Sequence, residues 1–177
     1  AWPAAWNPAN GGGVPFASSE FFVSTNFFRA RDALRQHVLD VAQLVRVLTP
    51  TPAAPPVPIP GHDAFNALLG AGTVLDPSRV YFLGDSLGAM AGVMDVAANP
   101  RLGRAVLEVP GGTLADAILL SPDFAGAVPP LLAPLGCTWP PATPAQAAPC
   151  LQLVTTIKWI LDPADPLNFA RHVTATP

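Results

Sequence analysis

The sequence predicts an α/β fold in which helices flank a parallel sheet. An apolar run at residues 80–83 leads into a Gly-x-Ser-x-Gly motif at residues 84–88. A helical pattern of small residues follows as far as residue 98, and a second apolar run covers residues 105–109. Strand, helix and strand in this order predict a right-handed crossover between two parallel strands.

The clearest helical pattern covers residues 27–48. Its apolar side chains recur at three- and four-residue steps and form one stripe, with charged and amide side chains largely on the other side. Ser24, Thr25 and Asn26, which precede it, are favourable N-cap residues. Shorter helices are predicted at residues 63–69, 86–98, 114–120 and 150–161, and a turn with a short helix at residues 165–172.

All 177 residues are interpreted as a single, partial domain. Residues 1–23 are expected to be irregular, and residues 49–60 to form a proline-rich surface loop, because each proline removes a donor and restricts its neighbour. Residues 122–149 are also proline-rich and are expected to cover the site like a lid. Two predicted strands are too few for a sheet of this kind. We therefore expect the flanking strands to lie on additional polypeptide.

Composition limits the classes of partner. The formal net charge is -3 and the sequence pI is about 5.4, which argues against nucleic acid as the main partner. No uninterrupted apolar run reaches the length of a membrane span. Only 12% of residues are charged and 50% are hydrophobic, so either the surface is unusually apolar or part of it is covered by something outside this sequence.

Cys137 and Cys150 are the two cysteines, and they bracket a loop rich in proline and alanine. Neither has a second Cys or a His at the spacing of a metal site, so no metal or other cofactor is expected. We expect the two to form a disulfide, which would indicate an extracellular, periplasmic or cell-surface location. Two buried thiols are the alternative.

Ser86 is the candidate nucleophile, because a Gly-x-Ser-x-Gly motif between a strand and a helix is typical of a nucleophile elbow. Gly84 and Gly88 are expected to leave no side chain where the turned backbone runs close to its neighbours. The Leu87 N–H, at the helix N-terminus, is the candidate oxyanion donor. The alternative is an ordinary serine on a glycine-rich turn.

A serine nucleophile needs a general base, which in turn needs an orienting carboxylate. His37 and His62 precede Ser86 and are interpreted as a helix-surface and a loop residue. His172 alone follows it, with Asp162 and Asp165 shortly before, and this group is only a fallback for base and acid. Asp95 and Glu108 are interpreted as structural, and Asp85 receives no catalytic role.

On these residues the chain resembles the α/β-hydrolase superfamily, specifically bacterial serine esterase or lipase-like members. Residues 28–48 are similar to the helix before the elbow strand, residues 76–88 to the elbow, and residues 107–112 to the next strand and its end. Residues 161–171 are similar to a stretch before the acid-bearing strand. The resemblance implies Ser86 as nucleophile and Leu87 N–H as one oxyanion donor. It places the second donor upstream of this chain, and the acid and histidine downstream of His172.

The sequence therefore predicts a hydrolase of carboxylic or lipid esters that acts through Ser86 and is active only with additional polypeptide. The apolar segment 125–135 suggests a lipophilic, ester-like small molecule as substrate. One alternative is a non-catalytic, hydrolase-fold subunit of an extracellular or cell-surface assembly. A proline-rich module for peptide binding or adhesion is a further alternative, supported by composition alone.

Overall fold

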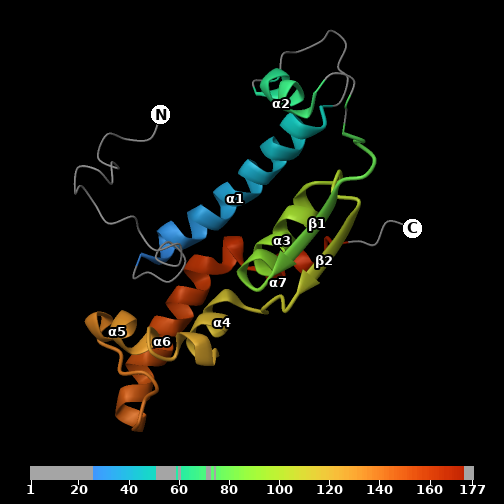
Figure 1. The fold of residues 1–177 in the computed structure, drawn as a ribbon. Helices are drawn as coiled ribbons and strands as arrows, with labels where there is room; N and C mark the ends of the chain where they lie inside the picture. Colours follow the sequence, from blue (N-terminus) through green and yellow to red (C-terminus); the bar gives the residue numbers. More distant parts are fainter. Residues whose placement is uncertain (1–25, 51–58, 60, 71–72, 74, 174–177) are drawn as a thin grey trace, which may run out of the picture.

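The computed structural model describes residues 26–50, 59, 61–70, 73 and 75–173, which form helices around a two-stranded sheet (Figure 1). The predictions for residues 1–23 and for most of the loop 49–60 lie outside the described residues. In chain order the helices and strands are α1 Phe27–Leu48, α2 His62–Leu69, β1 Tyr81–Asp85, α3 Leu87–Ala98, β2 Arg104–Glu108, α4 Leu114–Leu120, α5 Val128–Leu132, α6 Pro144–Leu161 and α7 Pro166–Ala170. Short 3-10 turns occupy Pro122–Phe124, Ala133–Leu135 and Asp162–Ala164.

The sheet consists of β1 and β2, which are parallel and joined by α3. Their register pairs Tyr81 with Arg104 at one end and Asp85 with Glu108 at the other. The predicted strand–helix–strand unit is confirmed, with strand boundaries moved by one or two residues, and so is the α/β class. Within the described residues each strand has one neighbour, so a larger hydrolase-type sheet is not seen there.

Helix α3 covers one face of the sheet (Figure 1). Gly92 makes this close approach possible, because a Cβ at that position would lie 2.8 Å from Leu107 Cδ2 and would also meet the Phe82 ring. The opposite face carries Leu83 and Val106, whose exposed fractions are 76% and 62%. Apolar side chains of this size are expected to be covered in a complete sheet.

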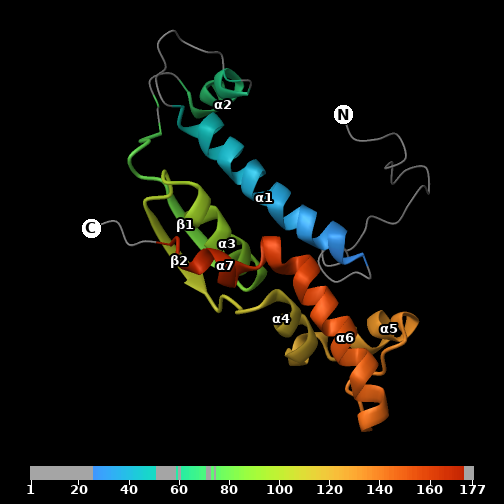
Figure 2. The ribbon, with the colours of Figure 1, turned by 180° about the vertical axis from the view of Figure 1, so that it is seen from behind.

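The main core lies between α1, α3, α4 and α6, which pack together in both views of the ribbon (Figures 1 and 2). Helix α1 has the predicted boundaries. It begins after Asn26 because the Asn26 side chain accepts a hydrogen bond from the Arg29 N–H at 3.0 Å, which satisfies a donor at the helix N-terminus. The inward stripe of α1 contributes the buried Phe27, Ala30 and Leu34.

Helix α6 begins at Pro144, six residues before the predicted start at residue 150. Thr143 is its N-cap and accepts from the Gln146 N–H, and proline is favourable at the first helical position because its missing N–H would have no partner there. The expected loop between Cys137 and Cys150 is therefore helical from Pro144 onward, and the prediction is wrong there. Within the proline-rich segment 122–149, α5 buries Val128 and Leu132 against the core.

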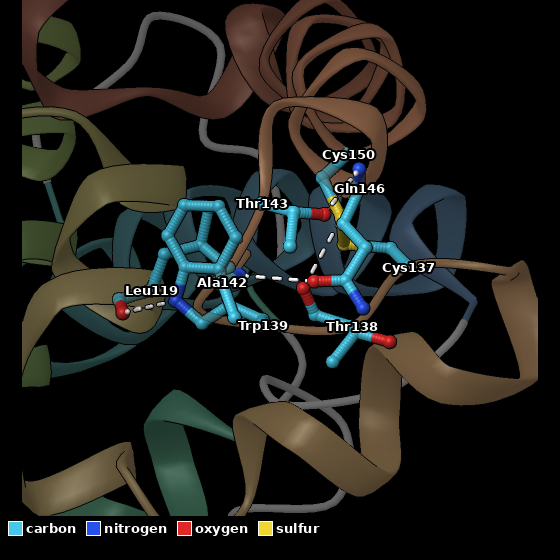
Figure 3. The surroundings of a disulfide bond; sticks show 8 residues. All are labelled: Leu119, Cys137, Thr138, Trp139, Ala142, Thr143, Gln146 and Cys150. Carbon is cyan, nitrogen blue, oxygen red and sulfur yellow. Dashed lines mark hydrogen bonds between the residues drawn. A yellow bond between two sulfur atoms is a disulfide. The ribbon is translucent and has the colours of Figure 1, made fainter.

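The predicted Cys137–Cys150 disulfide is present and ties the turn after α5 to α6 (Figure 3). Both cysteines are buried. Beside the bridge, the Trp139 indole N–H donates to the Leu119 carbonyl at 3.2 Å. The disulfide and this hydrogen bond connect the proline-rich segment to both α6 and α4.

Two further features concern only the part of the chain that the structure describes. No helix there combines the length and the apolar character needed to cross a bilayer. In the same residues, no three His, Cys, Asp or Glu side chains gather closely enough to hold a metal ion.

Candidate functional site

Ser86 lies between the last residue of β1 and the first residue of α3. Its backbone has φ 51° and ψ -115°, a conformation that costs a residue with a side chain about 1–3 kcal/mol. Such strain persists only where the surrounding structure enforces it. The predicted strained turn at the candidate nucleophile is therefore present; the nucleophilic role of Ser86 stays a prediction.

The two glycines of the motif differ in what surrounds them. A Cβ on Gly84 would lie 2.7 Å from the carbonyl carbon of Gly88 and 2.9 Å from the Ala89 nitrogen. A Cβ on Gly88 would have no described atom within 4 Å. The expectation that both positions exclude a side chain is therefore correct for Gly84 and wrong for Gly88, where only the backbone takes part in the close approach.

Main-chain hydrogen bonds surround Ser86 on both sides. Its N–H donates to the Glu108 carbonyl at 3.1 Å, which extends the ladder between the strands by one residue. Its carbonyl accepts from the N–H groups of Ala89 and Met90, both at 3.0 Å. Leu87 supplies the first N–H of α3, where the helix dipole favours negative charge. These bonds fix the turn at the carboxyl end of the sheet.

His37 contacts α3 at Asp95, nine residues along the chain from Ser86. Its Nε2 lies 3.1 Å from Asp95 Oδ2 and joins α1 to α3. The hydrogen bond to Asp95 raises the pKa of His37; burial opposes this rise, and the charges of Asp95 and Asp40 add to it. The Asp95 side chain is fully buried, and its Oδ1 has no hydrogen-bond partner in the described structure. The structural interpretation of Asp95 is consistent with this contact.

His62 is the first residue of α2, so its interpretation as a loop residue is wrong, and both of its ring nitrogens have partners. Nδ1 lies 2.7 Å from the Val47 carbonyl and Nε2 lies 2.8 Å from Asn66 Nδ2. An imidazole that donates through Nδ1 and accepts through Nε2 satisfies both contacts. His62 therefore fastens α2 to the end of α1.

Asp165 caps two helices. Its Oδ2 accepts from the buried Leu114 N–H at the start of α4 at 2.8 Å, and its Oδ1 accepts from the Leu167 N–H of α7 at 3.0 Å. Burial raises the pKa of the Asp165 carboxyl, and the two N–H groups oppose that rise. Asp162 instead accepts from the Asn168 side chain at 2.9 Å. The predicted fallback role as catalytic acid finds no support in these contacts.

His172 follows α7, and its Nε2 accepts a hydrogen bond from Arg171 Nε at 3.1 Å. It shares a groove along the outer edge of β2 with Val96, Ala97 and Pro100. No contact among the described residues joins His172 or Asp165 to Ser86, so the fallback triad has no support from these contacts.

Val109 is a feature that the sequence reasoning missed. It follows the last residue of β2 and has φ 46°, a left-handed conformation that is a genuine outlier for a β-branched residue. Valine has no sequence signature for such a conformation. The Pro-Gly-Gly that follows indicated only that the strand ends there.

Comparison of the chain with models of protein families, with curated proteins and with solved structures found no match in any of the three.

Proposed function

We propose that this chain forms the core of a serine hydrolase of the α/β-hydrolase kind, which cleaves carboxylic esters through Ser86. The observation that carries the proposal is the strained backbone of Ser86 between β1 and α3. The approach of Gly84 to the Gly88 backbone supports the same turn. A turn of this kind exposes a serine hydroxyl at the carboxyl end of a strand.

In the proposed reaction, Ser86 Oγ attacks the ester carbonyl carbon while its proton passes to a general base. The oxyanion that forms accepts a hydrogen bond from the Leu87 N–H. The tetrahedral intermediate then collapses, the C–O bond to the alcohol breaks, and the alcohol leaves with the proton from the base. Water, activated by the same base, attacks the acyl-serine and releases the carboxylic acid.

The base and its acid are proposed to come from additional polypeptide, because the contacts of His37, His62 and His172 lie elsewhere. The second oxyanion donor is proposed to have the same origin. The exposed sheet face with Leu83 and Val106 is consistent with additional polypeptide that covers this face. The working enzyme would then be this chain together with the segments that complete its sheet.

The proposed substrate is an ester with a lipophilic acyl group, in keeping with the apolar segment 125–135. The proposed location is extracellular, periplasmic or cell-surface. The Cys137–Cys150 disulfide supports an oxidising compartment, where such bridges persist.

Hydrolysis of a chromogenic short-chain acyl ester by the complete protein tests the proposal. Ser86→Ala should lower kcat by at least about a thousandfold, because it removes the nucleophile. Ser78→Ala is the matched control, since Ser78 is an exposed serine that bonds only locally to Asp76. Full activity in the Ser86→Ala protein would refute the proposed role.

A second candidate function is a non-catalytic subunit of hydrolase fold in an extracellular or cell-surface assembly. It is favoured by the positions of the three histidines, none of which is placed against Ser86 by its described contacts. In this case the complete protein would bind its partner chain equally well with and without Ser86, and neither form would hydrolyse the ester.

A further inference from the structure

Two strained residues stand side by side at the carboxyl end of the sheet. Ser86 and Val109 are the non-glycine residues with positive φ among those the structure describes. Each follows the last residue of a strand, and those two residues, Asp85 and Glu108, are paired in the register. The strained positions are therefore equivalent places on neighbouring parallel strands.

The two positions are also connected through the main chain. The Ser86 N–H donates to the carbonyl of Glu108, the residue immediately before Val109. The direction in which the chain leaves β2 at Val109 therefore affects the position of the Glu108 carbonyl, which accepts from the Ser86 N–H.

The chain beyond Val109 turns back onto the first turn of α3. A Cβ on Gly111 would lie 2.9 Å from Met90 Sδ and 3.4 Å from Ala117 Cβ, so this part of the chain lies against side chains of α3 and α4. The Met90 N–H in turn donates to the Ser86 carbonyl. Contacts thus run in a closed circuit from Ser86 through Glu108, Val109, Gly111 and Met90 back to Ser86.

The side chain of Val109 does not explain its conformation, because 70% of it is exposed. Burial of the valine side chain therefore offsets little of the free energy that a positive φ costs. The positive φ of Val109 instead directs the backbone toward Gly111. Strain that is not explained by packing is a reason to look for a role in positioning.

We propose that Val109 is a positioning residue for the Ser86 elbow. Its left-handed backbone directs residues 109–112 across the first turn of α3, and this brace holds the Glu108 carbonyl against the Ser86 N–H. The inference rests on the proposed function for its catalytic meaning, since it concerns how a nucleophile is held. The geometry of the brace can be tested independently of catalysis.

The first test compares two neighbouring glycines in the complete protein. Gly111→Val places a side chain against Met90 and should displace the brace, whereas a Cβ on Gly112 meets no described atom within 4 Å, so Gly112→Val is the matched control. Amide hydrogen exchange is measured by NMR at Ser86 and at Gly103, whose N–H bonds the Val80 carbonyl at the far end of the sheet. We expect Gly111→Val to speed exchange at Ser86 about tenfold and to leave Gly103 unchanged, as for a local opening.

The second test varies the backbone at Val109 itself. Val109→Gly can adopt the same φ and should keep the wild-type exchange rate at Ser86. Val109→Pro fixes φ near about -65° and should speed that exchange, as the brace can no longer follow its path. If Val109→Pro prevents folding, the comparison of Gly111→Val with Gly112→Val still decides whether the brace holds Ser86. Unchanged exchange at Ser86 in Gly111→Val, or equal changes in Gly111→Val and Gly112→Val, would overturn the inference.

Labelling by a fluorophosphonate separates this inference from the proposed function. If wild-type Ser86 is labelled, Gly111→Val should lower its maximal labelling rate by about tenfold with little change in probe affinity, because orientation is lost. If wild-type Ser86 is never labelled, the proposed function fails, and the exchange rates still decide whether the brace exists.

Discussion

The backbones of Gly84 and Gly88 lie so close together that a Cβ on Gly84 would be 2.7 Å from the Gly88 carbonyl carbon. The two ends of the motif are therefore in direct backbone contact across Ser86. The Gly88 carbonyl carbon belongs to the main chain and cannot move aside as the end of a flexible side chain could. The requirement for glycine at position 84 thus follows from the turn itself.

Gly84→Ala should lower the free energy of unfolding by about 1–3 kcal/mol or more, since the added methyl group overpacks against backbone. Gly88→Ala should be neutral or stabilise by about 0.5 kcal/mol, because alanine favours a helix and the space is open. Urea unfolding followed by circular dichroism measures both values. Equal losses in the two variants would contradict the structure of the turn.

The His37–Asp95 contact predicts a dependence of stability on pH. Because the pKa of His37 is raised in the folded state, its contribution is complete below the ordinary pKa of about 6.5 and is lost as the pH rises through the raised value. We expect His37 to contribute about 1 kcal/mol or less to the free energy of unfolding, since 44% of its side chain is exposed and solvent screens the pair. Unfolding between pH 5.5 and 8.5 should show this loss in wild type and not in His37→Gln. The same slope in both proteins would refute the coupling.

Asp165→Ala should remove the acceptor of two helix N-terminal N–H groups and cost about 2 kcal/mol of stability. Asp162→Ala is a suitable control, since Asp162 is exposed and bonds one side chain. Thermal unfolding gives the comparison. A smaller loss for Asp165→Ala than for Asp162→Ala would contradict the capping role.

Removal of the disulfide by the double change Cys137→Ala and Cys150→Ala should cost about 3 kcal/mol in the chain-entropy model. Alanine is chosen because both positions are buried and a serine hydroxyl would need a partner. Urea unfolding of the oxidised protein and of the variant gives the difference. Two reactive thiols in the unfolded, unreduced protein would show that the bridge is absent.

Local sequence patterns were sufficient for several elements. The apolar stripe and the Asn26 cap predicted both ends of α1, and the apolar runs 80–83 and 105–109 with the helical pattern between them predicted the strand–helix–strand unit. The early start of α6 was missed because Pro144 and Pro149 were interpreted as irregular structure. Proline at the first turn after a Thr143 cap is compatible with a helix.

The strained turn at Ser86 could be predicted from sequence, because the close approach that requires glycine at position 84 involves only residues 84–89. The contacts of His37 with Asp95, and of Asp165 with Leu114, join residues more than fifty positions apart and depend on how helices pack. The left-handed Val109 could not be predicted, since valine disfavours that conformation. Tertiary structure overrides local preference at this position.

The measurement that tests the central claim most directly is treatment of the complete native protein with a fluorophosphonate, followed by peptide mass spectrometry. We expect a single adduct on Ser86, absent from Ser86→Ala and from heat-denatured protein. An adduct there means that a base and oxyanion donors are assembled around the serine. No adduct on Ser86, while a control serine hydrolase in the same sample is labelled, would contradict the proposed hydrolase.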